Sequence, residues 1–129
     1  MSTSTRYPST NAVGSTGFTN PGNAYASDDS YATAAPGVLS TISSYFGGFD
    51  FASYIPSGAT INSVTVYCER KFSTTASNAS STLRPYNLTT ALAAEIENTT
   101  EPTTDTVYSV NFGALAVADV RSADFRILV

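Results

Sequence analysis

The sequence predicts an all-β protein, built as an antiparallel β-sandwich. Ser and Thr occupy 37 of the 129 positions, whereas the charged residues together make up only 12%. Thr, Tyr, Phe and Val favour strands, and Gly, Pro, Asn and Ser favour the turns between strands. One run, from Val64 to Lys71, alternates apolar and polar residues as a half-buried strand does. At this length we expect a single domain with one modest core.

The first nineteen residues are polar and rich in Ser, Thr and Gly, without sustained periodicity. We therefore expect 1–19 to form an extended N-terminal arm outside the core, followed by a β-sandwich domain over 20–129. Such an arm becomes ordered against a neighbour in an assembly. A frayed terminus is the simpler interpretation for the isolated chain.

The first structured segment is expected over 20–36. It begins with the turn-forming sequence Asn20-Pro21-Gly22-Asn23 and continues as a short strand that Ser27–Ser30 interrupts. The adjacent carboxylates of Asp28 and Asp29 offer the hard oxygen ligands that Ca²⁺ binds. The spacing of a calcium-binding loop is missing, however. An Asx turn, in which an Asp side chain caps a backbone N–H, is therefore the favoured interpretation.

The segment from Val38 to Phe72 has the clearest pattern. An aromatic strand is expected within Tyr45–Phe51, where the pair Gly47-Gly48 indicates a bulge or the close approach of another backbone. The run Ile55–Thr60 has the composition of a tight turn. Its proline fixes φ at one corner, and Gly58 permits a positive φ at the next.

Alternation after this turn assigns side chains to two faces of one strand. The inward residues are Val64, Val66 and Cys68, and the outward residues are Thr65, Tyr67, Glu69 and Lys71. Cys68 is then a small buried hydrophobic residue, and no histidine exists to activate it. A lone cysteine and a polar N-terminus without a signal-peptide core suit synthesis in a reducing cytoplasm.

The C-terminal half is less regular. Three further strands are expected over 83–88, 107–112 and 125–129, with one short helical turn over 118–123. Pro85 cannot donate a ladder hydrogen bond, so its strand is expected at a sheet edge or at a bulge. The polar runs Ser73–Thr82 and Asn98–Thr106 are expected to be loops.

The residue inventory excludes most catalytic chemistry. There is no histidine, which removes Ser-His-Asp and Cys-His arrangements and imidazole metal ligands. Glycoside hydrolysis needs only two carboxylates, but the acidic residues are scattered and there is no tryptophan platform for a sugar. The pair Gly47-Gly48 lacks the lysine and helix of a phosphate-binding loop. We therefore expect no enzymatic activity and no cofactor.

Charge and hydropathy exclude two further partners. The net charge is −4, and the only adjacent basic residues are Arg70 and Lys71, the single lysine of the chain. Binding a phosphate backbone requires several clustered basic residues, so we expect no nucleic-acid partner. No apolar run approaches the roughly 20 residues that cross a bilayer, so we expect no membrane partner.

Several stretches carry a resemblance to a known kind of module. They are Asn20 to Ala32, Gly48-Phe49, Ile55-Pro56-Ser57-Gly58-Ala59-Thr60-Ile61-Asn62-Ser63-Val64-Thr65-Val66 and Glu69-Arg70. Together they resemble a jelly-roll β-sandwich module of tailed-bacteriophage virion proteins, which decorate the head or form tail-associated parts. The Ile-Pro-x-Gly-Ala-Thr-Ile step also resembles one in jelly-roll modules of bacterial surface and carbohydrate-active proteins. The resemblance extends over 20–129 and implies a fold, with no site residue to carry over.

The end of the chain departs from this pattern. Modules of this kind continue past Ala118–Phe125 into a further alternating strand, whereas this chain ends at Val129. Either that strand is lacking or the native protein continues. A sandwich without it would expose a pairing edge. We expect a neighbouring subunit to complete that edge by strand addition.

The resemblance implies a non-enzymatic structural protein of the virion, made in the host cytoplasm. The expected role is a capsid decoration or cement protein that contacts other virion proteins and itself. The candidate interface residues are Tyr7, Phe18, Tyr25, Tyr31 and Tyr45, because aromatic residues supply contact area at low entropic cost. Packing within the sandwich explains each tyrosine equally well.

An alternative function belongs to a different class. A carbohydrate-binding module on a tail or fibre would use tyrosine rings with Asn or Asp side chains. The expected positions are the loops Ser27–Ser30 and Ser73–Thr82. The absence of tryptophan weakens this alternative, and a glycan array separates it from a cement protein.

Overall fold

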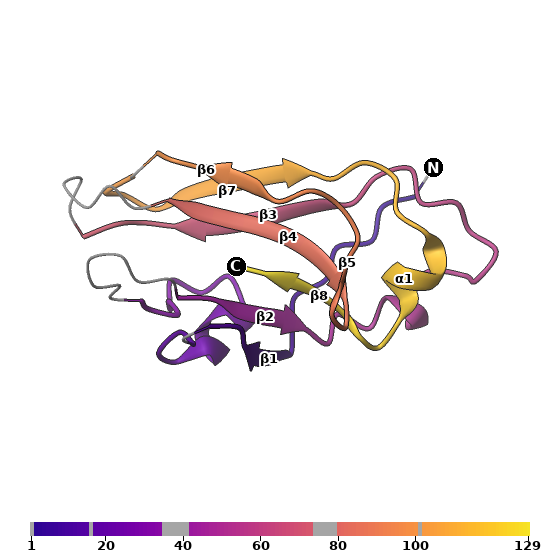
Figure 1. Ribbon diagram of the computed structural model, residues 1–129, viewed down its shortest axis with the longest axis horizontal. Coiled ribbons are helices and arrows are strands. Elements are labelled where there is room, and N and C mark those ends of the chain that lie inside the picture. The colour runs from indigo at the N-terminus through magenta and orange to yellow at the C-terminus, as the bar shows by residue number, and fades with distance from the viewer. Residues whose placement is uncertain (1, 16, 35–41, 74–79, 101) are drawn as a thin grey trace.

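The computed structural model describes residues 2–15, 17–34, 42–73, 80–100 and 102–129. These residues form mostly antiparallel β-structure with very little helix, which confirms the all-β prediction. The strands lie in two sheets that face each other in a sandwich-like arrangement (Figure 1).

The larger sheet contains strands from both ends of the chain. Its strands are β1 (Thr10–Val13), β2 (Ser44–Gly47), β4 (Ser81–Asn87), β5 (Thr90–Ala91), β6 (Ile96–Asn98) and β8 (Phe125–Leu128). They are ordered β1-β2-β8-β4-β5, and β6 pairs with β4 on the same side as β5. The C-terminal strand β8 therefore lies in the sheet interior, between β2 and β4. The open edge that we expected from the end of the chain does not lie at β8.

The smaller sheet consists of β3 (Thr65–Arg70) and β7 (Thr106–Asn111), paired antiparallel with Tyr67 opposite Ser109. Val66 and Cys68 are half-buried, whereas Tyr67 is exposed, so the predicted alternation is confirmed.

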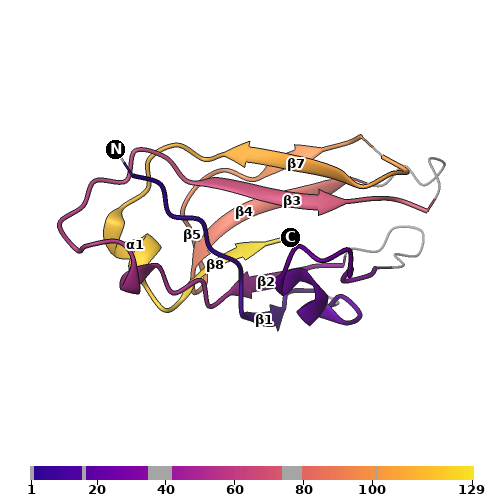
Figure 2. The ribbon, with the colours of Figure 1, turned by 180° about the vertical axis from the view of Figure 1, so that it is seen from behind.

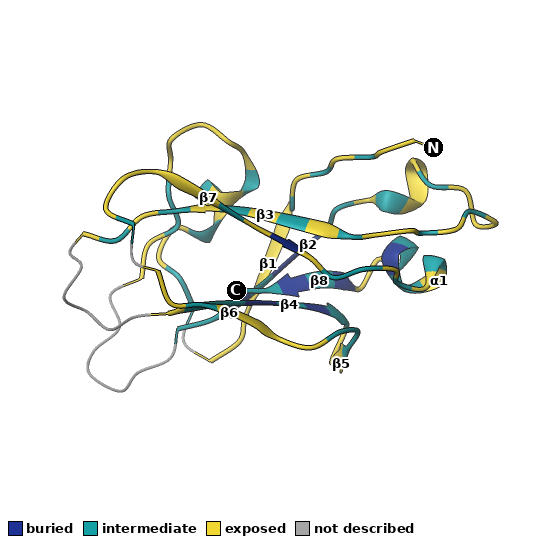
Figure 3. Ribbon diagram, turned by 90° about the horizontal axis from the view of Figure 1, so that it is seen from above, coloured by how far each residue is buried: buried dark blue, intermediate teal, exposed yellow. Residues whose placement is uncertain are grey.

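The core lies between the sheets. Its buried apolar side chains are Leu83, Val110, Val120, Phe125 and Ile127. Figure 3 shows that the buried positions gather on β2, β4 and β8, with one further position each on β7 and α1. Burying side chains of this kind stabilises the fold by about 1.5–3 kcal/mol each.

One end of the core is closed by short helical segments. The helix α1 (Val117–Arg121) supplies Val120, and the 3₁₀ turn η2 (Phe51–Ser53) supplies Phe51. The Nε of Arg121 donates a hydrogen bond to the carbonyl of Ile55 at 2.7 Å, which ties the helix to the segment after η2. The predicted helical turn near 118–123 is confirmed.

Of the two expectations for Pro85, a sheet edge is wrong, whereas the irregular pairing expected of a bulge is present: residues 84–85 of β4 face residues 92–95 between β5 and β6. Pro85 is fully buried in β4, which pairs with β8 on one side and with β5 and β6 on the other. β6 pairs with residues 81–83 and β5 with 86–87, so Pro85 lies where the pairing on that side is interrupted. Its carbonyl still accepts a hydrogen bond from Leu92 at 2.9 Å. A residue without an N–H is tolerated at this gap because no ladder bond requires its donor.

The N-terminal segment is more ordered than an arm. Thr10–Val13 forms β1, whose four residues are exposed but whose backbone pairs with β2. Before it, the Nε of Arg6 donates a hydrogen bond to the carbonyl of Phe49 at 3.0 Å, and the guanidinium lies 4.0 Å from the ring centroid of Tyr54. Figure 2 shows this segment running from the side of β3 across to β1. The polar composition gave no indication of this strand, because β1 pairs with β2 through backbone hydrogen bonds.

The segment after residue 19 also differs from its prediction. Pro21–Tyr25 forms a 3₁₀ turn, η1, and residues 26–34 after it contain no strand. Only an isolated antiparallel bridge between Thr19 and Thr33 remains of the expected short strand.

Of the two expectations for glycine residues, the one for Gly47-Gly48 is confirmed and the one for Gly58 is wrong. The carbonyl oxygen of Phe125 lies 3.3 Å from the position that a Cβ of Gly47 would take, so the expected close backbone approach is confirmed for Gly47. The turn after residue 55 also forms, with the N–H of Ala59 donating to the carbonyl of Pro56 at 3.1 Å. Gly58 does not adopt a positive φ in it, so the expectation for this residue was wrong. Pro56 is the first residue of the turn, which shifts the central positions relative to the expected corner.

Candidate interaction surfaces

Three carboxylates from distant parts of the chain meet beside the smaller sheet. One oxygen each of Asp29, Glu69 and Asp105 lies within 4.8 Å of the others, and all three residues are exposed. The cluster already holds counter-groups. The Nζ of Lys71 lies 3.2 Å from Oδ1 of Asp105, and the hydroxyl of Tyr31 donates to Oε1 of Glu69 at 2.9 Å. The carboxylates are thus partly neutralised by the protein itself.

Tyr31 and Asp105 influence each other's ionisation. The hydrogen bond with Asp105, desolvation and the hydrogen bond with Glu69 all raise the pKa of Tyr31 above its ordinary value. The same hydrogen bond with Tyr31, followed by the one with Lys71, lowers the pKa of Asp105. Both effects have one cause: a protonated phenol beside ionised carboxylates is favoured over two adjacent anions.

We expect Tyr31 to ionise at a higher pH than an ordinary tyrosine when the folded protein is titrated with base. Because its pKa is raised on folding, its contribution to stability is complete below about pH 10 and is lost as the pH rises through the folded-state pKa. Tyrosinate absorbance measures the titration, and Tyr31→Phe should remove the late step.

A pair of substitutions tests the cause of this shift. Glu69→Gln should move the late step to lower pH, because an acceptor charge beside Tyr31 is lost. Glu97→Gln, on β6, removes an exposed carboxylate outside the cluster and should leave the step unchanged. A late step that persists unchanged in Glu69→Gln would contradict the assignment.

The outer face of the smaller sheet exposes two large apolar side chains. Tyr67 is 69% exposed and Val107 is 58% exposed. Tyr67 pairs with Ser109, and Glu69 pairs with Val107, so Tyr67 and Val107 are diagonal neighbours on one face. Within the described residues, no further strand pairs with β3 or β7. This sheet therefore presents an apolar pair between two unpaired strand edges.

The outer face of the larger sheet carries alternating cationic and aromatic side chains. The guanidinium carbon of Arg126 lies 3.8 Å from the ring centroid of Tyr45, and Tyr45 meets Tyr86 edge-on at 5.3 Å. Arg84 lies over Tyr86 at 5.6 Å. All four residues are half-buried. Each arginine donates through Nε to a backbone carbonyl, that of Leu88 or Ala93, which fixes its position on the sheet.

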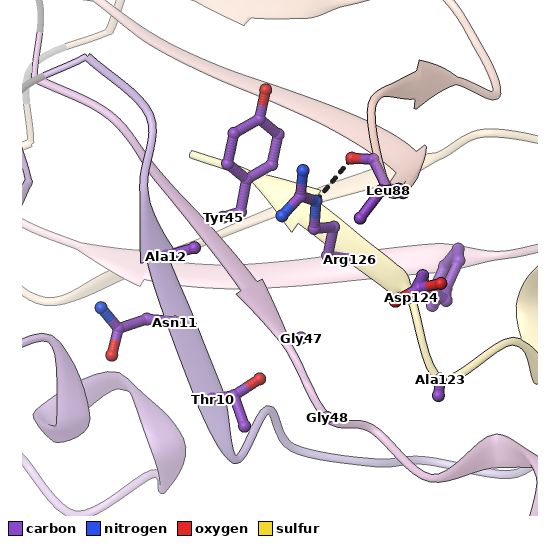
Figure 4. Close-up of a pocket in the computed structure, with 11 residues that line it drawn as sticks. Thr10, Asn11, Ala12, Tyr45, Gly47, Gly48, Leu88, Ala123, Asp124 and Arg126 are labelled. Carbon is purple, nitrogen blue, oxygen red and sulfur yellow. Dashed lines mark hydrogen bonds between the residues drawn. The ribbon is translucent and has the colours of Figure 1, made fainter.

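A hollow of about 160 Å³ opens beside this row, at the end nearest β1. It is lined by Thr10–Ala12 of β1, by Tyr45, Gly47 and Gly48, by Leu88, and by 123–126. Figure 4 shows Arg126 between the Tyr45 ring and the Leu88 backbone, with its hydrogen bond to the Leu88 carbonyl dashed. The hollow therefore has one cationic wall whose orientation is fixed.

The five aromatic residues predicted at an interface do not form one surface. Tyr7 is 56% exposed on the N-terminal segment, and Phe18 is half-buried against Phe46 with ring centroids 6.2 Å apart. The hydroxyl of Tyr25 donates to Asn11 at 2.7 Å beside β1. Tyr31 lies at the carboxylate cluster and Tyr45 at the hollow. The interface role of these residues remains a prediction.

The other predicted site residues have clear positions. Oδ1 of Asp28 accepts a hydrogen bond from the N–H of Ser30 at 3.1 Å, the geometry of an Asx turn, whereas Asp29 joins the carboxylate cluster. Residues 74–79 of the loop expected at 73–82 lie outside the described residues. Burial raises the pKa of the Cys68 thiol, while Arg70 opposes that shift. A thiol held neutral by burial is a poor nucleophile.

The residues that make the two surfaces were not predicted from the sequence. Val107 was predicted to lie in a strand, but not on which face of it. Arg126 was predicted only to lie in the C-terminal strand. Alternation within Thr106–Asn111 was the available signal for Val107. No local signal pairs Arg126 with Tyr45, because they meet through sheet register.

Comparisons with known proteins returned no family model, no curated protein and no solved structure that matches this chain. Among the described residues, no helix combines the length and the apolar character needed to cross a membrane.

Proposed function

We propose that this chain is a non-enzymatic structural protein of a bacteriophage virion, acting as a capsid decoration protein with a jelly-roll-like sandwich. The outer face of the β3–β7 sheet is the observation that carries the proposal. The sequence resemblance suggests attachment to a capsid, and this face offers a means of attachment: an apolar pair flanked by unpaired strand edges.

The exposed pair supports attachment to another protein surface. Tyr67 and Val107 are among the most exposed large apolar residues of the chain. Tyrosine supplies a broad, rigid contact area and is enriched at interface centres. The surrounding polar residues Thr65, Ser109 and Asn111 suit a rim, since they remain hydrated in the free protein.

The unpaired edges of β3 and β7 support the same conclusion. An open edge presents backbone donors and acceptors that a neighbouring chain can pair with. We assign the strand addition expected of this protein to these edges. The N-terminal segment, on which Tyr7 is exposed, is a second contact available to a neighbouring subunit.

The chemistry of the chain supports a role without catalysis. There is no histidine, and the one carboxylate cluster found among the described residues holds Lys71 and Tyr31 as internal partners. Charged groups that neutralise each other in this way suit a surface whose protonation state does not change, rather than a site that transfers protons.

The first test is the copy number of the protein in purified particles of the virus that encodes it, measured by quantitative mass spectrometry against the major capsid subunit. Hundreds of copies per particle are the expected result. A handful of copies would instead favour a tail- or fibre-associated carbohydrate-binding module. A protein absent from the particle would contradict any virion role.

A substitution series tests the docking face. The double variant Tyr67→Ser, Val107→Ser should lose binding to particles that lack the protein, because both apolar contacts are removed. Val13→Ser is a matched control, since Val13 is a 61% exposed strand residue on the other sheet. Equal binding by the double variant and the control would exclude this face.

A further inference from the structure

We infer that the hollow beside Gly47 is a binding site for a sugar ring with neighbouring hydroxyl groups. This inference goes beyond the decoration role, because the hollow lies on the larger sheet and not on the β3–β7 face. It also places sugar binding away from the loops that sequence reasoning favoured.

The hollow exists because one position in a row of outward side chains is a glycine. Register places Thr10 opposite Gly47, Gly47 opposite Arg126, and Arg126 opposite Tyr86. A Cβ added to Gly47 would lie 3.3 Å from Cβ of Arg126 and 3.4 Å from Oγ1 of Thr10. Gly47 itself is buried and forms the floor of the hollow, and Thr10 and Arg126 flank it on opposite sides.

Arg126 supplies fixed donors on one wall. Its Nε donates to the carbonyl of Leu88 at 2.7 Å, and its guanidinium stacks on Tyr45. Among the described residues, none accepts a hydrogen bond from its terminal amino groups, and none forms an ion pair with it. A guanidinium already held in position loses little conformational entropy when a ligand binds its free donors.

Asp124 supplies an acceptor two residues earlier. It lies in the turn just before β8, among the residues that line the hollow. Its backbone is fixed: the N–H of Asp124 donates to the hydroxyl oxygen of Ser122 at 3.1 Å, and its carbonyl accepts from the N–H of Leu88 at 3.0 Å. Asp124 is exposed, so its carboxylate is accessible to a ligand.

These groups together select the class of ligand. A free anion would be attracted by Arg126 but opposed by Asp124, and a free cation attracted by Asp124 but opposed by Arg126, so neither gains much from the two opposite charges that line the hollow. A sugar hydroxyl both donates and accepts, so two neighbouring hydroxyls can satisfy a carboxylate and a guanidinium at once. Hydrogen bonds to charged groups are the stronger kind, and the Thr10 hydroxyl offers a further partner.

The experiment is a titration followed by backbone amide NMR shifts. The probes are the methyl glycosides of glucose, mannose and galactose, which present neighbouring hydroxyls in different orientations, with glucuronate as an acidic probe. Each is added to about 10 mM, which fills most of a site with a Kd of about 1 mM. Shifts at Thr10, Gly47, Gly48 and Arg126 are expected with at least one neutral glycoside.

Three variants make the test specific. Arg126→Met and Asp124→Ala should each weaken binding by about tenfold or more, the effect of losing a hydrogen bond to a charged group. Arg84→Met is the matched control, because Arg84 stacks on Tyr86 of the same face but does not line the hollow. It should bind as the native protein does. A well-dispersed spectrum shows that each variant remains folded.

Other outcomes would overturn the inference. Absence of shifts with every probe, or shifts that lie elsewhere, would exclude this hollow as a sugar site. Binding of glucuronate alone that persists in Asp124→Ala would show an anion site instead of a hydroxyl-pair site. None of these results bears on particle attachment, which is measured separately through Tyr67 and Val107.

Discussion

Replacing Phe125 by alanine is expected to lower the free energy of unfolding by about 3–5 kcal/mol. Phe125 is 3% exposed at the start of β8, and its ring centroid lies 5.9 Å from that of Phe49 and 6.0 Å from that of Phe51. Removing the ring leaves a cavity, because β8 is held between two strands and cannot move in to fill it. Denaturant unfolding followed by circular dichroism measures the loss.

The matched control is Val107→Ala, which removes apolar atoms from an exposed strand position and should change stability by about 0.5 kcal/mol or less. Domains of this kind are stable by only about 5–15 kcal/mol, so Phe125→Ala removes a large share of the total. A loss below about 1 kcal/mol would contradict the placement of Phe125 at the centre of the core.

The second large effect is expected from a series of glycine-to-alanine substitutions. Gly48 has a φ of 71°, and an added Cβ would clash with the hydroxyl of Ser9. Gly113 has a φ of 74° with open space around it, and Gly58 has neither a positive φ nor a neighbour within 4 Å. The three sites therefore separate backbone strain from steric overlap.

The expected order of stability follows from these two costs. Gly58→Ala should be neutral or stabilising by up to about 1 kcal/mol, because it restricts only the unfolded chain. Gly113→Ala should destabilise by about 1–2 kcal/mol, the cost of a left-handed residue with a Cβ. Gly48→Ala should lose about 1 kcal/mol more than that, because overlap is added to strain.

A second-site change tests the steric part. Ser9→Ala in the Gly48→Ala background removes the clashing hydroxyl and should recover part of the loss. Equal losses at Gly48 and Gly113 would instead show that Ser9 moves aside without cost. Ser9 is tied to β2 through its N–H, which donates to the carbonyl of Gly47 at 2.8 Å, so we expect it to resist.

Patterns within a single strand were predictable. The two faces of β3, the strands β7 and β8, the helical turn α1 and the Asx turn at Asp28 all follow from neighbouring residues. Each depends on a period of two, on helix propensity, or on a side chain that bonds to its own backbone. These features depend only on residues close together in the chain, so they can be predicted from the sequence.

Positions that depend on strand pairing were not predictable. Nothing in its neighbours indicates that Pro85 belongs to an interior strand, because that depends on where β5 and β6 leave a gap. The polar segment at Thr10–Val13 becomes a strand only because β2 offers it an edge. Sequence propensity did not decide either case.

The candidate surfaces divide in the same way. The outward position of Tyr67, the lack of histidine chemistry and the strand-rich fold all follow from residue types and their alternation along the chain. The meeting of Asp29, Glu69 and Asp105, and the position of Arg126 beside Gly47, arise from how distant segments fold together. The physical reason is that alternation fixes a side chain's face, whereas its neighbours are fixed by sheet register, which the burial of the whole core selects.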